Sequence, residues 1–334
     1  MKRCLLMVAV CVFGWLAHAE KRSSFVPGAV WPDTEGVHIN AHGGGFLFHD
    51  GMYYWFGEHK IAGPKGNSAQ VGVRCYSSAD LYNWKNEGVA LAVSDDPDSD
   101  MAKGCILERP KVVYNRATRQ FVMWFHLELK GEGYSSARSG VAVSDRVTGP
   151  YRFVESFRPN GAMARDQTLF VDDDGAAYHL YASENNATLH ISRLTDDYLK
   201  PSGDYRRLFE KRSMEAPAIC KRDGKYYFLG SGCTGWRPNA ARSAVASHIF
   251  GPWEELGNPC AGTNPGLGVG PEKTFGGQST YLLPVQGKPG AVVAVFDVWT
   301  PKNPIDGTYL FLPVAFENGG FEIQWRDEWS LDDL

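Results

Sequence analysis

The sequence predicts an all-β chain folded as a five-bladed β-propeller, and three observations carry this prediction. A unit of apolar strand, tight turn and aromatic-rich strand recurs five times along the 334 residues. No segment keeps a helical period of apolar residues. The units begin 49 to 66 residues apart, a spacing that a β-sandwich or a two-domain β protein has no reason to show.

The five units read as β-hairpins. Their first strands begin at Phe46, Val112, Leu169, Ala218 and Thr280. Three turns carry the Asp-Gly pair that favours two-residue hairpin turns, namely Asp50-Gly51, Asp174-Gly175 and Asp223-Gly224. A third strand often follows each hairpin. The residues before His42 and the segment 309–329 are expected to supply outer strands and close the ring.

Residues 1–19 have the features of a secretory signal peptide. Lys2 and Arg3 precede an apolar run from Leu5 to Leu16, and a small-residue cleavage site, Ala17-His18-Ala19, ends the segment. The run is too short to span a bilayer. We therefore expect a secreted or periplasmic protein whose mature chain, residues 20–334, is a single catalytic propeller.

Charge and cysteine content narrow the class of partner. The formal net charge is −4, and no basic block is present, which argues against nucleic acid and anionic membranes. Five cysteines follow the leader without a CxxC spacing, so neither a zinc site nor a dense disulfide framework is indicated. The sequence allows one disulfide bond but does not indicate which two cysteines would form it. We expect a neutral partner and a monomer.

A polar residue stands just before each first strand of the repeat. In a propeller the innermost strands run along the central axis, so these residues should meet at one axial mouth. They are His42, Glu108, Asp166, Glu215 and Gln278. Simple structural roles compete with this interpretation. Glu108 could pair with Arg109 and Asp166 with Arg165, whereas Glu215 has no charged neighbour in sequence.

Several acids without metal-ligand spacing favour glycoside hydrolysis. In that chemistry one carboxylic acid protonates the leaving oxygen while a second group activates water or attacks the sugar. Glu215 is the candidate acid, and Asp166 is the neighbour that would keep it protonated. Tyr134 and Trp236 lie between repeats, where their rings could stack on sugars or simply pack.

Seven motifs make the chain resemble glycoside hydrolase family 43, in the branch of the exo-β-1,3-galactanases. They are Ile39-Asn40-Ala41-His42-Gly43-Gly44-Gly45, Tyr54-Trp55-Phe56-Gly57-Glu58, Glu108-Arg109-Pro110-Lys111, Arg165-Asp166, Glu215-Ala216-Pro217, Ser231-Gly232-Cys233-Thr234-Gly235-Trp236 and Gly277-Gln278-Ser279-Thr280. The resemblance covers nearly all of the mature chain. It implies a five-bladed propeller and an inverting mechanism, with Glu215 as acid and Asp166 as modulator of its pKa.

The same resemblance implies which residues contact the sugar, and it also shows one difference between this chain and most members of the family. It implies substrate contacts for His42, Glu58, Tyr134, Asn185, Thr234 and Trp236. Most members of the family carry an aspartate base at the start of blade one, where this chain reads Asn40-Ala41-His42. Two groups could handle the water instead. Gln278, favoured by the branch, would need an imidic tautomer, and Glu108, favoured by the chemistry, could act as a direct base.

Three functions therefore stay open at this point. The first is an exo-acting galactan 1,3-β-galactosidase that trims arabinogalactan-type backbones. The second is an α-L-arabinofuranosidase or galactofuranosidase of the same family, and the third is a propeller that binds carbohydrate without cleaving it. None calls for a cofactor, although a structural calcium ion in the channel stays open. The turn Asp172-Asp173-Asp174-Gly175 is better read as a hairpin tip than as a calcium loop.

Overall fold

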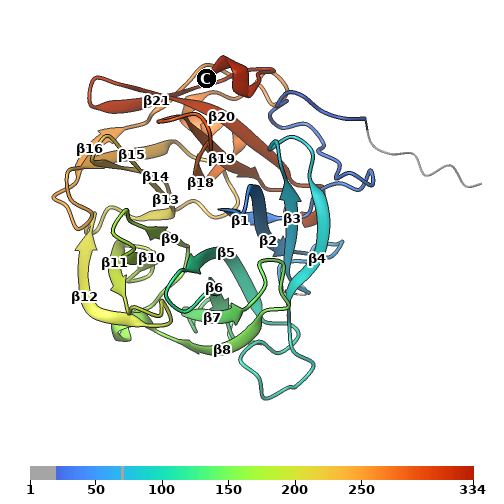
Figure 1. Ribbon diagram of the computed structural model, residues 1–334, viewed down its shortest axis with the longest axis vertical. Coiled ribbons are helices and arrows are strands. Elements are labelled where there is room, and N and C mark those ends of the chain that lie inside the picture. Colours follow the sequence, from blue (N-terminus) through green and yellow to red (C-terminus); the bar gives the residue numbers. More distant parts are fainter. Residues whose placement is uncertain (1–19, 69–70) are drawn as a thin grey trace, which may run out of the picture.

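The computed structural model describes residues 20–68 and 71–334, so the predicted signal peptide lies outside the described residues. The strands form five sheets arranged in a ring, antiparallel except where β17 joins the fifth sheet, which confirms the five-bladed propeller (Figure 1). Blades I to IV contain four strands each, in sequence order from the axis outward. Within the described residues, no helix reaches the length and apolarity needed to cross a bilayer.

The bounds of the strands follow the predicted repeat. Blade I holds β1 (His42–His49), β2 (Met52–His59), β3 (Gly72–Ser78) and β4 (Lys85–Ala92). Blade II holds β5 (Ile106–Asn115), β6 (Gln120–Glu128), β7 (Arg138–Ser144) and β8 (Arg152–Phe157). Blade III holds β9 (Gln167–Val171), β10 (Ala177–Ser183), β11 (Thr188–Leu194) and β12 (Pro201–Leu208). Blade IV holds β13 (Met214–Arg222), β14 (Lys225–Gly232), β15 (Ala241–Ala246) and β16 (Glu254–Gly257).

Blade V is built differently at its outer edge. It holds β18 (Gln278–Pro284), β19 (Val292–Val298), β20 (Thr308–Glu317), β21 (Gly320–Gln324) and the short β17 (Cys260–Ala261), which pairs parallel to β21. Short 3-10 turns stand at η1 (Pro159–Gly161), η2 (Pro271–Gly276), η3 (Pro304–Asp306) and η4 (Leu331–Asp333). The expected strands before His42 do not form. That segment makes only isolated bridges, among them Phe25 with Trp329, which ties the two ends of the described chain together.

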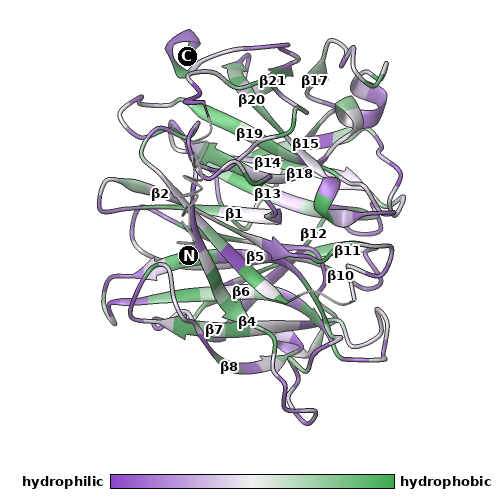
Figure 2. Cartoon of the chain, turned by 90° about the vertical axis from the view of Figure 1, so that its right-hand side faces the viewer, coloured by the Kyte–Doolittle hydropathy of each residue, from purple (hydrophilic) through white to green (hydrophobic). Residues whose placement is uncertain are grey.

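The hydrophobic core consists of five clusters, one for each interface between neighbouring blades. The cluster between blades I and V closes the ring, and it includes Phe25, Trp55, Phe311 and Trp329. Hydrophobic colour accordingly gathers on the strands, while the connecting loops are mostly hydrophilic (Figure 2). Because each blade buries both faces against its neighbours, the polar residues of the inner strands are held rigidly at the axis.

Candidate active site

A bulge recurs at the entrance of the inner strands. The register between first and second strands shifts after His42 in β1, after Glu108 in β5 and after Glu215 in β13. The next residue is left-handed in each case, with φ of 59° at Gly43, 52° at Arg109 and 56° at Ala216. An extra residue in one strand bends it and re-aims the adjacent side chain. The bulges therefore turn the polar residues of three blades out of the regular pleat.

Arg109 joins three blades at the axial mouth. Its Nε lies 2.9 Å from Asp166 Oδ2, and its Nη2 donates to Gln278 Oε1 at 2.5 Å. Nη1 donates to the backbone oxygen of Ser279. Asp166 precedes β9 and Gln278 begins β18, so this single guanidinium crosslinks blades II, III and V. The sequence alternatives, Glu108 with Arg109 and Asp166 with Arg165, are not the pairs that form.

Glu215 occupies the position expected of a general acid. Its Oε1 accepts from Gln278 Nε2 at 3.0 Å, while Asp166 Oδ2 accepts from the following residue, Ala216 N, at 3.0 Å. Burial first, and the negative charge of Asp166 second, raise the pKa of Glu215 to about 7, against the opposing charge of Arg109. Such a carboxyl retains a proton near neutral pH and can donate it.

Glu108 lies in a different electrostatic setting. Tyr134 Oη donates to its Oε1 at 2.7 Å, Asn67 Nδ2 donates to the same oxygen at 3.0 Å, and His126 Nδ1 lies 3.1 Å from Oε2. Burial opposes ionisation of Glu108, but the hydrogen bond and charge of His126 outweigh it and hold the pKa below its usual value. Glu108 is therefore an anion whose two oxygens already accept hydrogen bonds, which makes it a weak proton acceptor.

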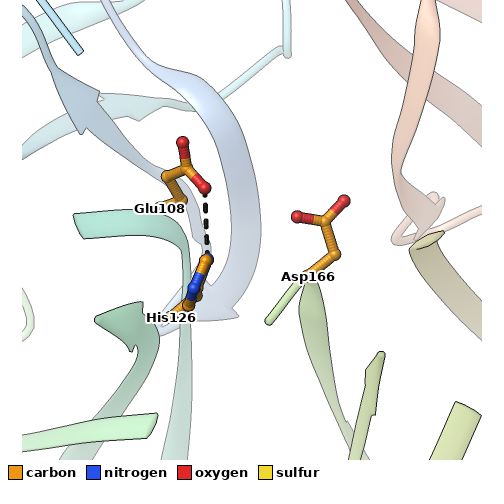
Figure 3. A group of neighbouring side chains, drawn as sticks. All are labelled: Glu108, His126 and Asp166. Atoms are coloured by element: carbon orange, nitrogen blue, oxygen red, sulfur yellow. Dashed lines mark hydrogen bonds and ion pairs between the residues drawn. The ribbon is translucent and has the colours of Figure 1, made fainter. Parts of the chain in front are cut away.

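The donor set around Glu108 suits an ion-pair network better than a metal. Ligand atoms of Glu108, His126 and Asp166 lie within 4.8 Å of one another, with Asp166 opposite the other two (Figure 3). However, His126 Nε2 also contacts Glu128 Oε1 at 2.8 Å, so both ring nitrogens face carboxylates. Burial opposes the charge, yet these two partners raise the pKa of His126 to about 9. A protonated imidazole has no lone pair for a metal ion, and Arg109 already neutralises Asp166.

His42 and Glu58, which are expected to contact the sugar, are both buried. His42 is 1% exposed and is stacked by Trp299, with ring centroids 4.7 Å apart. Glu58 is fully buried, where Lys60 Nζ lies 2.7 Å from its Oε2 and Arg109 N donates to its Oε1. Trp299, which directly follows β19, packs over His42, and Glu58 is enclosed by its contacts with Lys60 and Arg109.

The remaining predicted contacts surround the cluster at the surface. Trp236 is 47% exposed and meets Trp299 edge to face at 5.3 Å; the two rings and Gln278 line one small pocket. Tyr134 is partly exposed and reaches Glu108. Thr234 is exposed and hydrogen-bonds within its own loop, to Arg237 and Asn239. Asn185 is exposed, with Oδ1 at 3.4 Å from Arg165 Nη2.

Sequence reasoning missed four residues of this site. Arg109 and His126 hold the carboxylates, Asn186 contacts Glu215 through Nδ2 at 3.1 Å, and Trp299 covers His42. The sequence suggests Arg109 only as an ion-pair partner of its chain neighbour Glu108. His126 is a polar side chain within the otherwise mostly apolar strand β6, and this break in the apolar pattern is a sequence signal that could have identified it. No sequence signal distinguishes Trp299 from a packing residue.

All five cysteines of the described residues are unpaired.

Several solved structures similar to this chain are β-1,3-galactosidases or exo-β-1,3-galactanases. A family 43 β-1,3-galactosidase solved with galactodeoxynojirimycin is 47% identical, with a TM-score of 0.86 over 92% of this chain and 100% of the other. The exo-β-1,3-galactanase of Phanerochaete chrysosporium, solved with galactose, is 34% identical, with a TM-score of 0.83 over 92% of this chain and 68% of the other. The exo-β-1,3-galactanase of Clostridium thermocellum is 35% identical, with a TM-score of 0.82 over 91% and 66%.

Curated relatives are more distant and differ in substrate. A β-D-galactofuranosidase of Aspergillus niger is 25% identical over 60% of this chain, and a xylan 1,3-β-xylosidase of a Vibrio species is 26% identical over 55%. The matches span 62% and 36% of the lengths of these relatives. Residues 42–270, which include blades I to IV, match the glycosyl hydrolases family 43. The chain therefore belongs to glycosyl hydrolases family 43 and is a glycosidase.

Proposed function

We propose that this glycosidase is an exo-acting galactan 1,3-β-galactosidase, secreted or periplasmic, that inverts the anomeric carbon of the galactose it releases. The observation that carries the proposal is the burial of Glu215 next to the charge of Asp166, which together raise the pKa of the Glu215 carboxyl to about 7. The 47% identity to a β-1,3-galactosidase across that protein's full length supports galactose as the sugar.

In the proposed reaction Glu215 transfers its proton to the glycosidic oxygen as that bond breaks. A water molecule attacks the anomeric carbon from the opposite face, which inverts its configuration, and the proton that the water loses passes to the side-chain nitrogen of Gln278 in its imidic tautomer. Asp166, which pairs with Arg109, helps to keep the proton on Glu215 until the leaving oxygen can accept it. The residues 20–334 would act as one catalytic domain.

Gln278 is the better candidate to hold the attacking water. Both oxygens of Glu108 already accept hydrogen bonds, from Tyr134, Asn67 and His126, and its lowered pKa makes it a poor base. Glu108 would instead bind a sugar hydroxyl as an anion. Gln278 contacts Glu215 directly at 3.0 Å, whereas inverting enzymes need about 6.5–9.5 Å between acid and base for sugar and water. Substrate binding must therefore separate Gln278 from Glu215.

Product analysis tests the proposal. We expect the wild-type protein to release galactose from β-1,3-galactobiose and β-1,3-galactan, with α-galactose as the first anomer seen by NMR. Glu215→Gln should lose about 10²–10⁴-fold in kcat, the usual contribution of general acid catalysis. Glu254→Gln, an exposed glutamate on β16, is the matched control and should retain wild-type activity. Release of the β-anomer would contradict the inverting mechanism.

A second candidate is a galactofuranosidase, favoured by the curated Aspergillus niger relative. Parallel assays on 4-nitrophenyl β-galactopyranoside, β-galactofuranoside and α-L-arabinofuranoside separate the two, because only the matching sugar ring should be cleaved. Activity confined to a furanoside would replace the galactanase proposal. Tight binding of galactan without turnover would instead indicate a propeller that only binds carbohydrate.

A further inference from the structure

The loop between β10 and β11 has an unusual backbone. Three consecutive residues that are not glycine adopt left-handed conformations, with φ of 53° at Glu184, 56° at Asn185 and 64° at Asn186. Asparagine tolerates this region, but glutamate seldom visits it. Backbone conformations of this kind persist only where surrounding contacts over-determine them, and they gather at functional sites.

Glu184 is the anchor that holds this loop. Its carboxylate receives a two-pronged contact from Arg207, with Nε to Oε1 at 2.7 Å and Nη2 to Oε2 at 2.9 Å. The hydroxyl of Thr188 donates to Oε2 at 2.9 Å, and His190 Nε2 lies 3.1 Å from Oε1. All four side chains belong to blade III. The blade itself therefore fixes the direction in which the next two residues leave the sheet.

Asn186 extends from this loop to Glu215 on blade IV. Its Nδ2 donates to Glu215 Oε2 at 3.1 Å, while the other carboxylate oxygen, Oε1, accepts from Gln278. Asn186 Oδ1 is buried and has no hydrogen-bond partner in the described residues. The Cys233 thiol lies 3.8 Å from the Asn186 carbonyl oxygen and also faces Glu215. The amide is thus directed at the acid rather than at its own blade.

We propose that Asn186 is a positioning residue for Glu215, which fixes Oε2 through the left-handed Glu184–Asn186 loop. The inference rests on the proposed function, because it takes Glu215 as the general acid. Asn186 Nδ2 stabilises the carboxylate that remains after Glu215 has protonated the leaving oxygen. Asn186 therefore contributes most to the rate of cleavage when the substrate has a poor leaving group, which must be protonated to depart.

The charged and titratable groups that face Glu215 are few, which makes the effect measurable. Asp166 approaches from the start of β9, Arg109 from β5, and Cys233 from the loop after β14. Removal of the Asn186 donor destabilises the ionised form of Glu215, so its pKa should rise. Asn186→Asp should raise it further, because a second carboxylate is added while the residue size and the left-handed preference are kept.

The experiment compares wild type, Asn186→Ala and Asn186→Asp on two galactosides. We expect kcat/KM for β-1,3-galactobiose to fall about tenfold or more, and that for 2,4-dinitrophenyl β-galactoside, whose leaving group needs no protonation, to fall less than about threefold. The alkaline midpoint of the galactobiose pH profile should move upward in both variants, further in Asn186→Asp. Asn318→Asp, an exposed left-handed asparagine in the β20–β21 turn, should match wild type.

The outcomes separate this inference from the proposed function. If wild type cleaves neither galactoside, the proposed function fails. If wild type cleaves both and the two Asn186 variants keep its pH midpoint and its ratio of rates on the two substrates, the positioning role is wrong. A purely structural role would lower both rates equally and reduce the melting temperature. Asn186→Asp covers the case in which Asn186→Ala does not fold.

Discussion

Arg109 on β5 pairs with Asp166 of the next blade, Nε to Oδ2 at 2.9 Å, and not with its chain neighbour Glu108. The left-handed conformation of Arg109 at the β5 bulge turns its side chain away from that neighbour. As a result the two carboxylates of blades II and III acquire different partners. Asp166 pairs with the guanidinium of Arg109, whereas Glu108 contacts the imidazole of His126.

The wild-type pH profile should have an alkaline limb near neutrality. Glu215 must carry a proton to act as the acid, and burial together with Asp166 raises its pKa to about 7. Activity is therefore full below that pH and lost above it as Glu215 ionises. The measurement is kcat/KM on β-1,3-galactobiose from pH 4 to 10. A flat profile through pH 9 would contradict the assignment of Glu215.

Asp166→Asn should move that alkaline limb to lower pH. The change removes the negative charge that helps to raise the pKa of Glu215, so the acid ionises earlier, and it also removes the ion pair with Arg109. At pH 7 we expect kcat/KM to fall by about tenfold or more. Asp223→Asn, in the exposed β13–β14 turn, is the matched control. An unchanged midpoint in Asp166→Asn would show that Asp166 does not tune the acid.

Arg109→Lys should disrupt the site although it preserves the charge. The guanidinium serves Asp166, Gln278 and the Ser279 carbonyl at once, and an ammonium on a flexible stem cannot keep that planar geometry. We expect kcat to fall about tenfold to a hundredfold with a smaller change in KM. Arg116→Lys, on the exposed β5–β6 turn, should behave as wild type. Full activity in Arg109→Lys would mean that only the charge matters.

His126→Leu should destabilise the fold. It leaves Glu108 and the fully buried Glu128 without their shared cation, which costs about 3–5 kcal/mol for a broken buried pair. Urea unfolding at pH 6 measures the loss, and His248→Leu, an exposed histidine, should change stability by less than about 0.5 kcal/mol. Equal stability of wild type and His126→Leu would contradict a buried network.

The difference in stability between wild type and His126→Leu should change with pH in a defined direction. The pKa of His126 is raised from 6.5 to about 9, so its contribution to wild-type stability is full below pH 6.5 and lost as the pH rises through 9. The pKa of Glu108 is lowered, so its contribution is full above its usual value of 4.5 and lost in acid. The gap between wild type and His126→Leu should therefore be widest between pH 4.5 and 6.5.

Local sequence patterns predict much of the architecture. The pairs Asp50-Gly51 and Asp223-Gly224 take positive φ at both residues, as two-residue hairpin turns require, and the predicted hairpins are the inner two strands of each blade. Five repeats of that hairpin predict a closed ring, because each blade can bury its two faces only against neighbours. The polar residue ahead of each repeat then falls at the axis.

The sequence by itself determined five hairpins and the gathering of Glu108, Asp166, Glu215 and Gln278 near one mouth. Only the tertiary structure decided which partner each of them has. Arg109 and Asp166, or Asn186 and Glu215, meet across blade boundaries that no local pattern reports. His42 is buried because Trp299, more than 250 residues away in sequence, packs over it. Strand propensities and turns are local, whereas bulge direction and covering contacts depend on how neighbouring blades pack.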